Sequence, residues 1–101
     1  MNPGMIKKIQ QMQKDMVNAQ QELEASTFYG SAGGQIVKVE FTGDKKMKNI
    51  FINPEAIESI DDLEMLQDTI IAAVNDCIKK IDDETESVMG QFTGGGMPGL
   101  F

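Results

Sequence analysis

The 101-residue sequence predicts an α+β fold in which a long helix, a short three-stranded antiparallel sheet and a second long helix follow one another. Three observations predict this order: an apolar repeat at helical spacing near the N-terminus, alternating apolar residues in the middle, and a second apolar stripe near the C-terminus. We expect a single domain over residues 1–89 and a glycine-rich, flexible tail over residues 90–101.

The first helix is expected to begin near Pro3 and to end at about Ala25, because proline suits a helix start and strand-forming residues follow. One side of this helix carries an apolar seam at spacings of four and three residues: Met5, Ile9, Met12, Met16, Ala19 and Leu23. Such a repeat is typical of a helix that packs lengthwise against another helix. The partner is either a second copy of the chain or the last helix of the same chain.

The middle of the chain is expected to form three short strands, at residues 26–30, 35–42 and 47–52. Turns are expected between them, at residues 30–34 and 43–46. In the second strand Val37, Val39 and Phe41 share one face, and in the third Ile50 and Ile52 are expected to face inward. This pattern predicts a small sheet with one buried face.

The last helix is expected to run from about Asp62 to Val88, with Asp61 and Glu64 forming a capping box at its start. Its apolar stripe is broader than the seam of the first helix and comprises Leu63, Leu66, Ile70, Val74, Cys77, Ile81 and Val88, widened by Ile71, Ala73 and Ile78. A broad stripe favours a helix that lies on the sheet.

The composition limits the classes of function. A net charge of -7, from 16 acidic residues against nine lysines and no arginine, opposes a broad attraction to nucleic acid or anionic lipid. Polar residues interrupt the first apolar stretch, so we expect no signal peptide, no membrane span and a cytoplasmic protein. A single cysteine and no histidine exclude an intrachain disulfide and remove the usual nitrogen ligands of structural zinc.

No constellation of residues indicates catalysis. The glycine clusters lack the spacing of phosphate-binding loops, and the acidic clusters lack the pattern of a calcium loop. Cys77 lies on the apolar stripe with no histidine to activate it, so we expect a buried structural cysteine. We therefore expect no enzyme, no cofactor, no metal and no small-molecule substrate.

The lysines form three clusters. Lys45, Lys46 and Lys48 crowd the expected hairpin, where lysine commonly serves solubility or blocks edge pairing. Lys79 and Lys80 interrupt an acidic helix. The first helix carries Lys7, Lys8 and Lys14 in its first half, and in a dimer paired through the seam this patch would be doubled and could bind phosphate.

Several segments, in this order and spacing, resemble the YbaB/EbfC family of bacterial nucleoid-associated proteins. They are Gln10-Gln11-Met12-Gln13, the segment from Gly33 to Val39, Ile52-Asn53-Pro54, residues 61–68, residues 72–76 and the glycine-rich tail. The resemblance covers nearly the whole chain. It implies an α-β-β-β-α protomer that dimerises into a tweezer-like shape and binds DNA in the nucleoid without catalysis.

In this family the projecting first and last helices are implicated in DNA contact. The resemblance therefore implies Lys7, Lys8 and Lys14 as DNA-binding residues, with Lys79 and Lys80 as further candidates. Without arginine, we expect weakly selective binding of double-stranded DNA, dominated by phosphate contacts. The alternative is a non-enzymatic interaction dimer whose acidic last helix and tail recruit a protein, with indirect DNA association.

Overall fold

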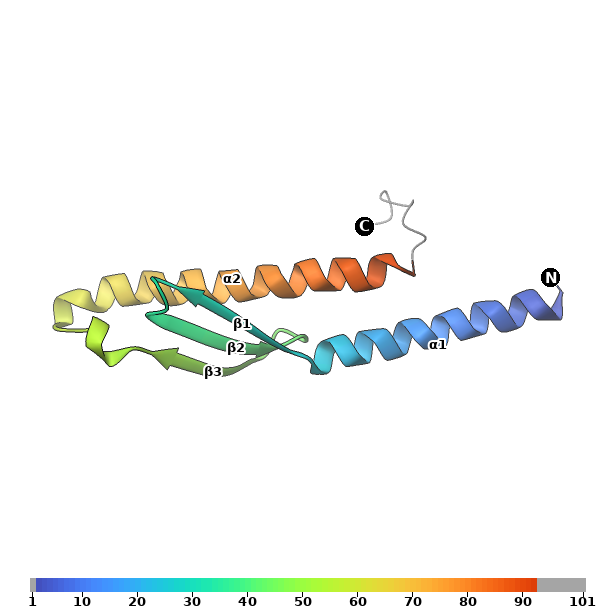
Figure 1. The fold of residues 1–101 in the computed structure, drawn as a ribbon, viewed down its shortest axis with the longest axis horizontal. Coiled ribbons are helices and arrows are strands. Elements are labelled where there is room, and N and C mark those ends of the chain that lie inside the picture. The colour runs from blue at the N-terminus through green and yellow to red at the C-terminus, as the bar shows by residue number, and fades with distance from the viewer. Residues whose placement is uncertain (1, 93–101) are drawn as a thin grey trace.

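The computed structural model describes residues 2–92 and confirms the predicted α-β-β-β-α order (Figure 1). The elements are α1 (Pro3–Ala25), β1 (Thr27–Ala32), β2 (Val37–Thr42), β3 (Met47–Ile52), the 3-10 turns η1 (Pro54–Ala56) and η2 (Ile60–Asp62), and α2 (Leu63–Gly90). The expected tail lies outside the described residues, apart from its first three positions. These continue α2 to Gly90 and then form a turn.

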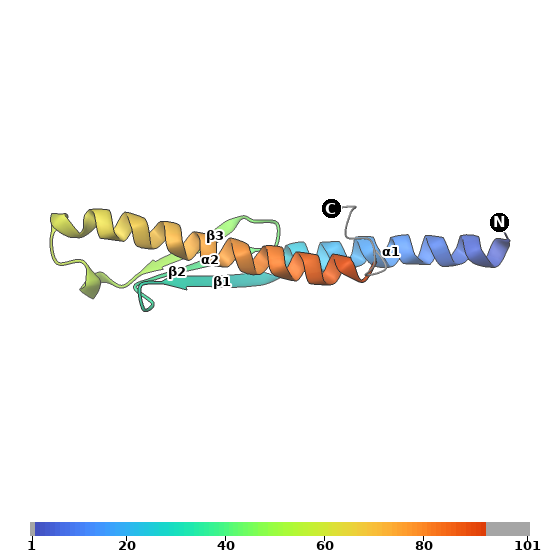
Figure 2. The same cartoon turned by 90° about the horizontal axis from the view of Figure 1, so that it is seen from above.

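The first helix is a long projecting arm. Asn2 caps it by accepting a hydrogen bond from the Met5 amide at 2.8 Å, and Pro3 occupies the first turn, where no amide donor is needed. Its last turn is fixed to the β2–β3 hairpin, because the Gly43 amide donates to the Ser26 carbonyl oxygen at 2.9 Å. In both views α1 extends away from the sheet (Figures 1 and 2).

Among residues 2–92, only the C-terminal end of the apolar seam is packed against other parts of the chain. Leu23 is buried, and together with Ala19 it lines a hollow beside Val88 of α2. At the other end of the seam, Met5 and Met12 are 52% and 48% exposed, and Ile9 is exposed as well. The last helix therefore does not cover the first half of the seam within a single chain. Of the two partners expected for the seam, the last helix of the same chain therefore covers the C-terminal part of α1.

The three strands pair in sequence order, β1-β2-β3, and both pairings are antiparallel. The first strand is longer than predicted: it continues through Gly30 to Ala32, where the sequence suggested a turn. The second strand is shorter and begins at Val37. Gly33 and Gly34 make the turn with positive φ angles of 66° and 64°, a conformation that glycine adopts without steric cost.

The core lies between one face of the sheet and α2. Val37, Val39 and Phe41 are buried as predicted, and they meet three small or branched residues of α2, namely Ala73, Cys77 and Ile81. Figure 2 shows α2 lying along the strands. Two expectations for the stripe were wrong. Leu63 and Ile71 are exposed. Ile71 turns away from the sheet, whereas Leu63 shares the helix face of Ile81 but is the first residue of α2.

The third strand lies largely beyond the cover of α2, which packs mainly on β1 and β2. Ile52 pairs with Val37 and packs against the core, in agreement with the prediction. Ile50 pairs with Val39 and so faces the same side, yet it remains 40% exposed. Met47 is exposed on the same side, opposite Phe41. The part of the inner sheet face formed by Met47 and Ile50 is therefore apolar and left exposed by residues 2–92.

The start of α2 is capped differently from the expectation of a box formed by Asp61 and Glu64. Ser59 accepts a hydrogen bond from the Asp61 amide at 3.2 Å, and the Asp62 carboxylate accepts from the Ser59 amide at 3.2 Å. The box therefore precedes η2, a short 3-10 turn that leads directly into the helix. The predicted capping box lies two residues C-terminal to the observed one, because the prediction did not include this 3-10 turn.

Candidate nucleic-acid interface

The first half of α1 presents three exposed lysines, Lys7, Lys8 and Lys14. The ion pairs found within residues 2–92 all involve other lysines. Asp15, the nearest acidic residue of the helix, accepts a hydrogen bond from Gln11 at 2.8 Å instead. The three ammonium groups are therefore available to an external anion.

The helix also sets how these lysines are arranged. Lys7 and Lys14 are seven residues apart, so they lie on the same side of α1, roughly 10 Å apart along the axis. Met5 precedes Lys7 by two residues and therefore lies on nearly the opposite side. Lys7, Lys14 and the seam can thus contact different partners at the same time, whereas Lys8, three residues after Met5, lies at the border of the seam.

The two lysines of α2 are engaged within the chain. Lys79 forms an ion pair with Asp83 at 2.9 Å, and the hydrogen bond in this pair raises the pKa of Lys79. Lys80 lies 3.2 Å from Asp76 and also donates to the Tyr29 carbonyl oxygen at 3.1 Å. Each of these charges has a local carboxylate partner, unlike those of α1.

Asp76 joins α2 to the first strand. Its carboxylate accepts a hydrogen bond from the Ser31 amide at 3.1 Å. This bond, followed by the interaction with Lys80, lowers the pKa of Asp76. Since the folded-state pKa is lowered, the stabilisation is present at neutral pH and is lost as the pH falls through that value. Lys80 and Asp76 are best explained as a structural link.

The structure does not bring the two sets of candidate lysines together. The first half of α1 lies at the far end of the arm, whereas Lys80 contacts β1 of the sheet. Figure 1 shows the start of α1, in blue, well away from the strands. Lys7, Lys8 and Lys14 therefore form a separate patch, which we call the α1 lysine patch.

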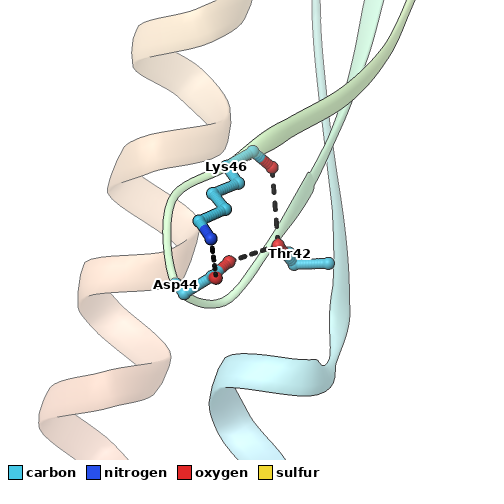
Figure 3. A network of polar contacts seen from close by, with 3 residues as sticks. All are labelled: Thr42, Asp44 and Lys46. Atoms are coloured by element: carbon cyan, nitrogen blue, oxygen red, sulfur yellow. Dashed lines mark hydrogen bonds and ion pairs between the residues drawn. The ribbon is translucent and has the colours of Figure 1, made fainter.

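The hairpin lysines have a role that the sequence analysis missed. Lys45 forms an ion pair with Asp82 of α2 at 2.7 Å, which fastens the hairpin to the helix. Lys46 lies 3.7 Å from Asp44, and the Thr42 hydroxyl donates to the same carboxylate (Figure 3). The Thr42 hydrogen bond is the main cause that lowers the pKa of Asp44. No local sequence signal links Lys45 to Asp82, because 36 residues separate them.

Two further features of the described residues are a buried cysteine and a hollow between the helices. Cys77 is fully buried, as predicted, and burial raises the pKa of its thiol. A hollow of about 380 Å³ lies where α1 and α2 meet, and its ionisable lining consists of Glu22 and Glu84. Residues 2–92 contain no group of three potential metal ligands. Over the same residues, neither helix has the length and apolar character needed to cross a membrane.

Comparisons with known proteins give one consistent result. The YbaB/EbfC DNA-binding family matches residues 1–97. A nucleoid-associated protein of Enterococcus faecalis is 46% identical over 97 residues, which cover 96% of this chain and 91% of the relative. One from Pediococcus pentosaceus is 52% identical over 81 residues, covering 80% of this chain and 76% of the relative.

A solved structure agrees at the level of the fold. An uncharacterized protein from Helicobacter pylori superposes with a TM-score of 0.73 at 18% identity, covering 92% of this chain and 98% of that one. The family match extends over both helices and the sheet. With these relatives and this fold, the chain belongs to the YbaB/EbfC DNA-binding family.

Proposed function

We propose that this protein is a non-enzymatic, nucleoid-associated DNA-binding protein of the cytoplasm that contacts double-stranded DNA mainly through phosphates. The observation that carries the proposal is the α1 lysine patch, with three exposed cations that have no ion-pair partner within the described residues. Lysine contacts to phosphate hold a protein on DNA but carry little sequence information. We therefore expect weak sequence preference.

The net charge of -7 does not oppose this proposal as strongly as the sequence alone suggested. The first 14 residues contain three lysines and no acidic residue. Lys8 precedes Ala19, where α2 first lies beside α1, by about 16 Å along the helix. At physiological salt the Debye length is about 8 Å, so the acidic end of α2 is largely screened from Lys7 and Lys8. Lys14, five residues before Ala19, is about 8 Å from it along the helix and is screened less.

The same proposal includes a homodimer in which a second copy covers the seam. Support comes from Met5, Ile9 and Met12, which form an exposed apolar row that no part of residues 2–92 covers. A helix with such a row gains free energy by burying it against another helix. Two chains joined in this way would carry two lysine patches on two arms.

A salt titration tests the DNA-binding proposal. With three lysines from each of two protomers, the slope of log affinity against log salt concentration is expected to be about -5, whereas a single protomer would give about -3. Fluorescence anisotropy with a labelled duplex provides the affinities, and light scattering provides the mass. An absence of binding at low salt, or an affinity that salt does not change, would refute the proposal and favour the protein-interaction alternative.

A second experiment tests the seam. Ile9→Lys combined with Met12→Lys is expected to convert the dimer to a monomer, because it places charges in the apolar row. The matched control is Ile6→Lys with Val17→Lys, since these residues are 42% and 48% exposed, like Ile9 and Met12, but lie off the seam. Mass in solution is the readout. The seam assignment fails if the control dissociates the dimer equally, or if only Ile50→Lys, on the exposed part of the inner sheet face, does so.

A further inference from the structure

The outer face of the sheet, opposite α2, carries two prominent aromatic side chains. Tyr29 on β1 is 60% exposed and Phe51 on β3 is 64% exposed. In the strand register Tyr29 lies beside Glu40, and Phe51 lies beside Lys38. The two rings therefore stand on either side of β2, and the sequence analysis assigned them no role.

Between the rings the surface is hollowed. The hollow has a volume of about 280 Å³ and is lined by Tyr29, Lys38, Val39, Glu40, Asn49 and Phe51. Small-molecule sites begin at roughly 300 Å³, so the hollow suits one small planar group better than an extended ligand. Val39 is buried on the opposite face, which leaves two aromatic rings and three polar side chains facing the hollow.

The polar side chains of this hollow are unused within the chain. Lys38, Glu40 and Asn49 have no side-chain hydrogen bond or ion pair to any residue from 2 to 92, and neither does the Tyr29 hydroxyl. An amide and a carboxylate can bond the edge of a nucleobase, and an ammonium group can bond phosphate. Aromatic rings on a sheet surface supply the stacking that unpaired bases require.

We propose that this outer sheet face binds an unpaired base of a single-stranded nucleic acid. The base stacks on Tyr29 or Phe51, its edge meets Asn49 and Glu40, and Lys38 contacts the neighbouring phosphate. The binding site is distinct from the α1 lysine patch, so each can fail without the other. DNA with a melted or single-stranded stretch is the class of ligand that it selects.

A second copy of the chain fits this face less well. Protein interfaces have an apolar core of adjoining side chains, whereas here charged and amide groups separate the two rings. The contiguous aliphatic surface lies on the other side of the sheet, at Met47 and Ile50. The unpaired Lys38 ammonium also complements a phosphate backbone. These features favour a nucleic acid over a protein on the outer face.

The chain offers a direct probe of the site, because Tyr29 is its single tyrosine and it has no tryptophan. Tyrosine fluorescence therefore reports on this ring alone. Addition of a short, unstructured single-stranded oligonucleotide is expected to quench the emission, after correction for absorbance, and an equal amount of duplex is expected to quench it far less. Failure of the single strand to quench would overturn stacking on Tyr29.

Substitutions separate the contribution of the two rings to binding from that of the rest of the protein. Tyr29→Thr with Phe51→Thr is expected to weaken single-strand binding by roughly tenfold or more while leaving duplex binding unchanged. Lys38→Gln is expected to make the salt slope shallower by about 0.7 per bound protomer. Ile71→Thr, which removes a 59% exposed side chain from α2, is the matched control and should change neither quantity.

Circular dichroism and thermal unfolding confirm that each variant is folded before binding is compared. Tyr29→Phe keeps the stacking surface and should retain the affinity, which separates loss of the ring from loss of the hydroxyl. The proposal is overturned if the double threonine variant binds single strands as tightly as the original protein. It is also overturned if that variant changes the mass in solution, because the face would then be a contact between protein chains.

Discussion

Replacing Lys8 and Lys14 with glutamate is expected to lower the affinity for duplex DNA about a thousandfold at about 0.1 M salt. In a dimer this change removes four of six proposed phosphate contacts, and each contact contributes about 0.9 to the exponent of the salt dependence. Both side chains are exposed, neither has an ion pair within the described residues, and neither lies on the seam. Fold and dimer should therefore persist.

The control must change the net charge equally without touching the α1 lysine patch. Lys48→Glu with Lys79→Glu meets this condition, because it alters the charge by the same amount at the hairpin and at a lysine already paired with Asp83. We expect this control to weaken binding less than tenfold. Equal losses in the two double variants, measured by anisotropy on the same duplex, would mean that net charge rather than the patch governs binding.

Gly30→Ala is expected to destabilise the fold by about 3 kcal/mol or more, which is a large part of the stability of a small domain. Gly30 lies in β1 where α2 passes close to the strand. A Cβ atom at this position would lie 2.7 Å from the Cys77 amide nitrogen and 2.6 Å from the Cys77 Cβ, and would also clash with the Ala73 carbonyl oxygen. These are backbone and near-backbone atoms of a helix, so rotation of a side chain cannot relieve the contact.

Urea unfolding followed by circular dichroism measures this effect. Gly4→Ala is the control, because a Cβ there meets only the Asn2 side chain at 3.4 Å. That substitution should be neutral or slightly stabilising, since alanine favours a helix more than glycine does. If Gly30→Ala has the stability of the original protein, α2 does not approach β1 as closely as described.

The features that the sequence predicted correctly are those with a local physical cause. The start of α1 was predicted from Pro3, which acts within the first turn. The buried face of β2 follows from the alternation of Val37, Val39 and Phe41, because successive side chains of a strand point to opposite faces. The apolar face of α2 follows in the same way from helical spacing.

The errors concern residues whose environment is set by distant parts of the chain. Ser31 and Ala32 look like turn residues in the sequence, yet they continue β1, where they pair with β2 and the Ser31 amide donates to Asp76 of α2. Ile71 looks like part of an apolar stripe, yet it turns away from the sheet and is exposed. The ion pair of Lys45 and Asp82 joins a hairpin to a helix, and no local sequence pattern predicts it.

The candidate site also combines features with a local cause and features set by distant parts of the chain. By itself the sequence determined that three lysines gather in the first half of α1, where Asp15 is the only acidic residue, and that an apolar seam follows the same helix, because both are properties of spacing along one element. Only the tertiary structure decided that Lys45 pairs with Asp82 and that Lys80 reaches β1, since these contacts join separate elements. It also decided that Tyr29 and Phe51 flank one hollow, because strand register places side chains from distant parts of the sequence on a common face.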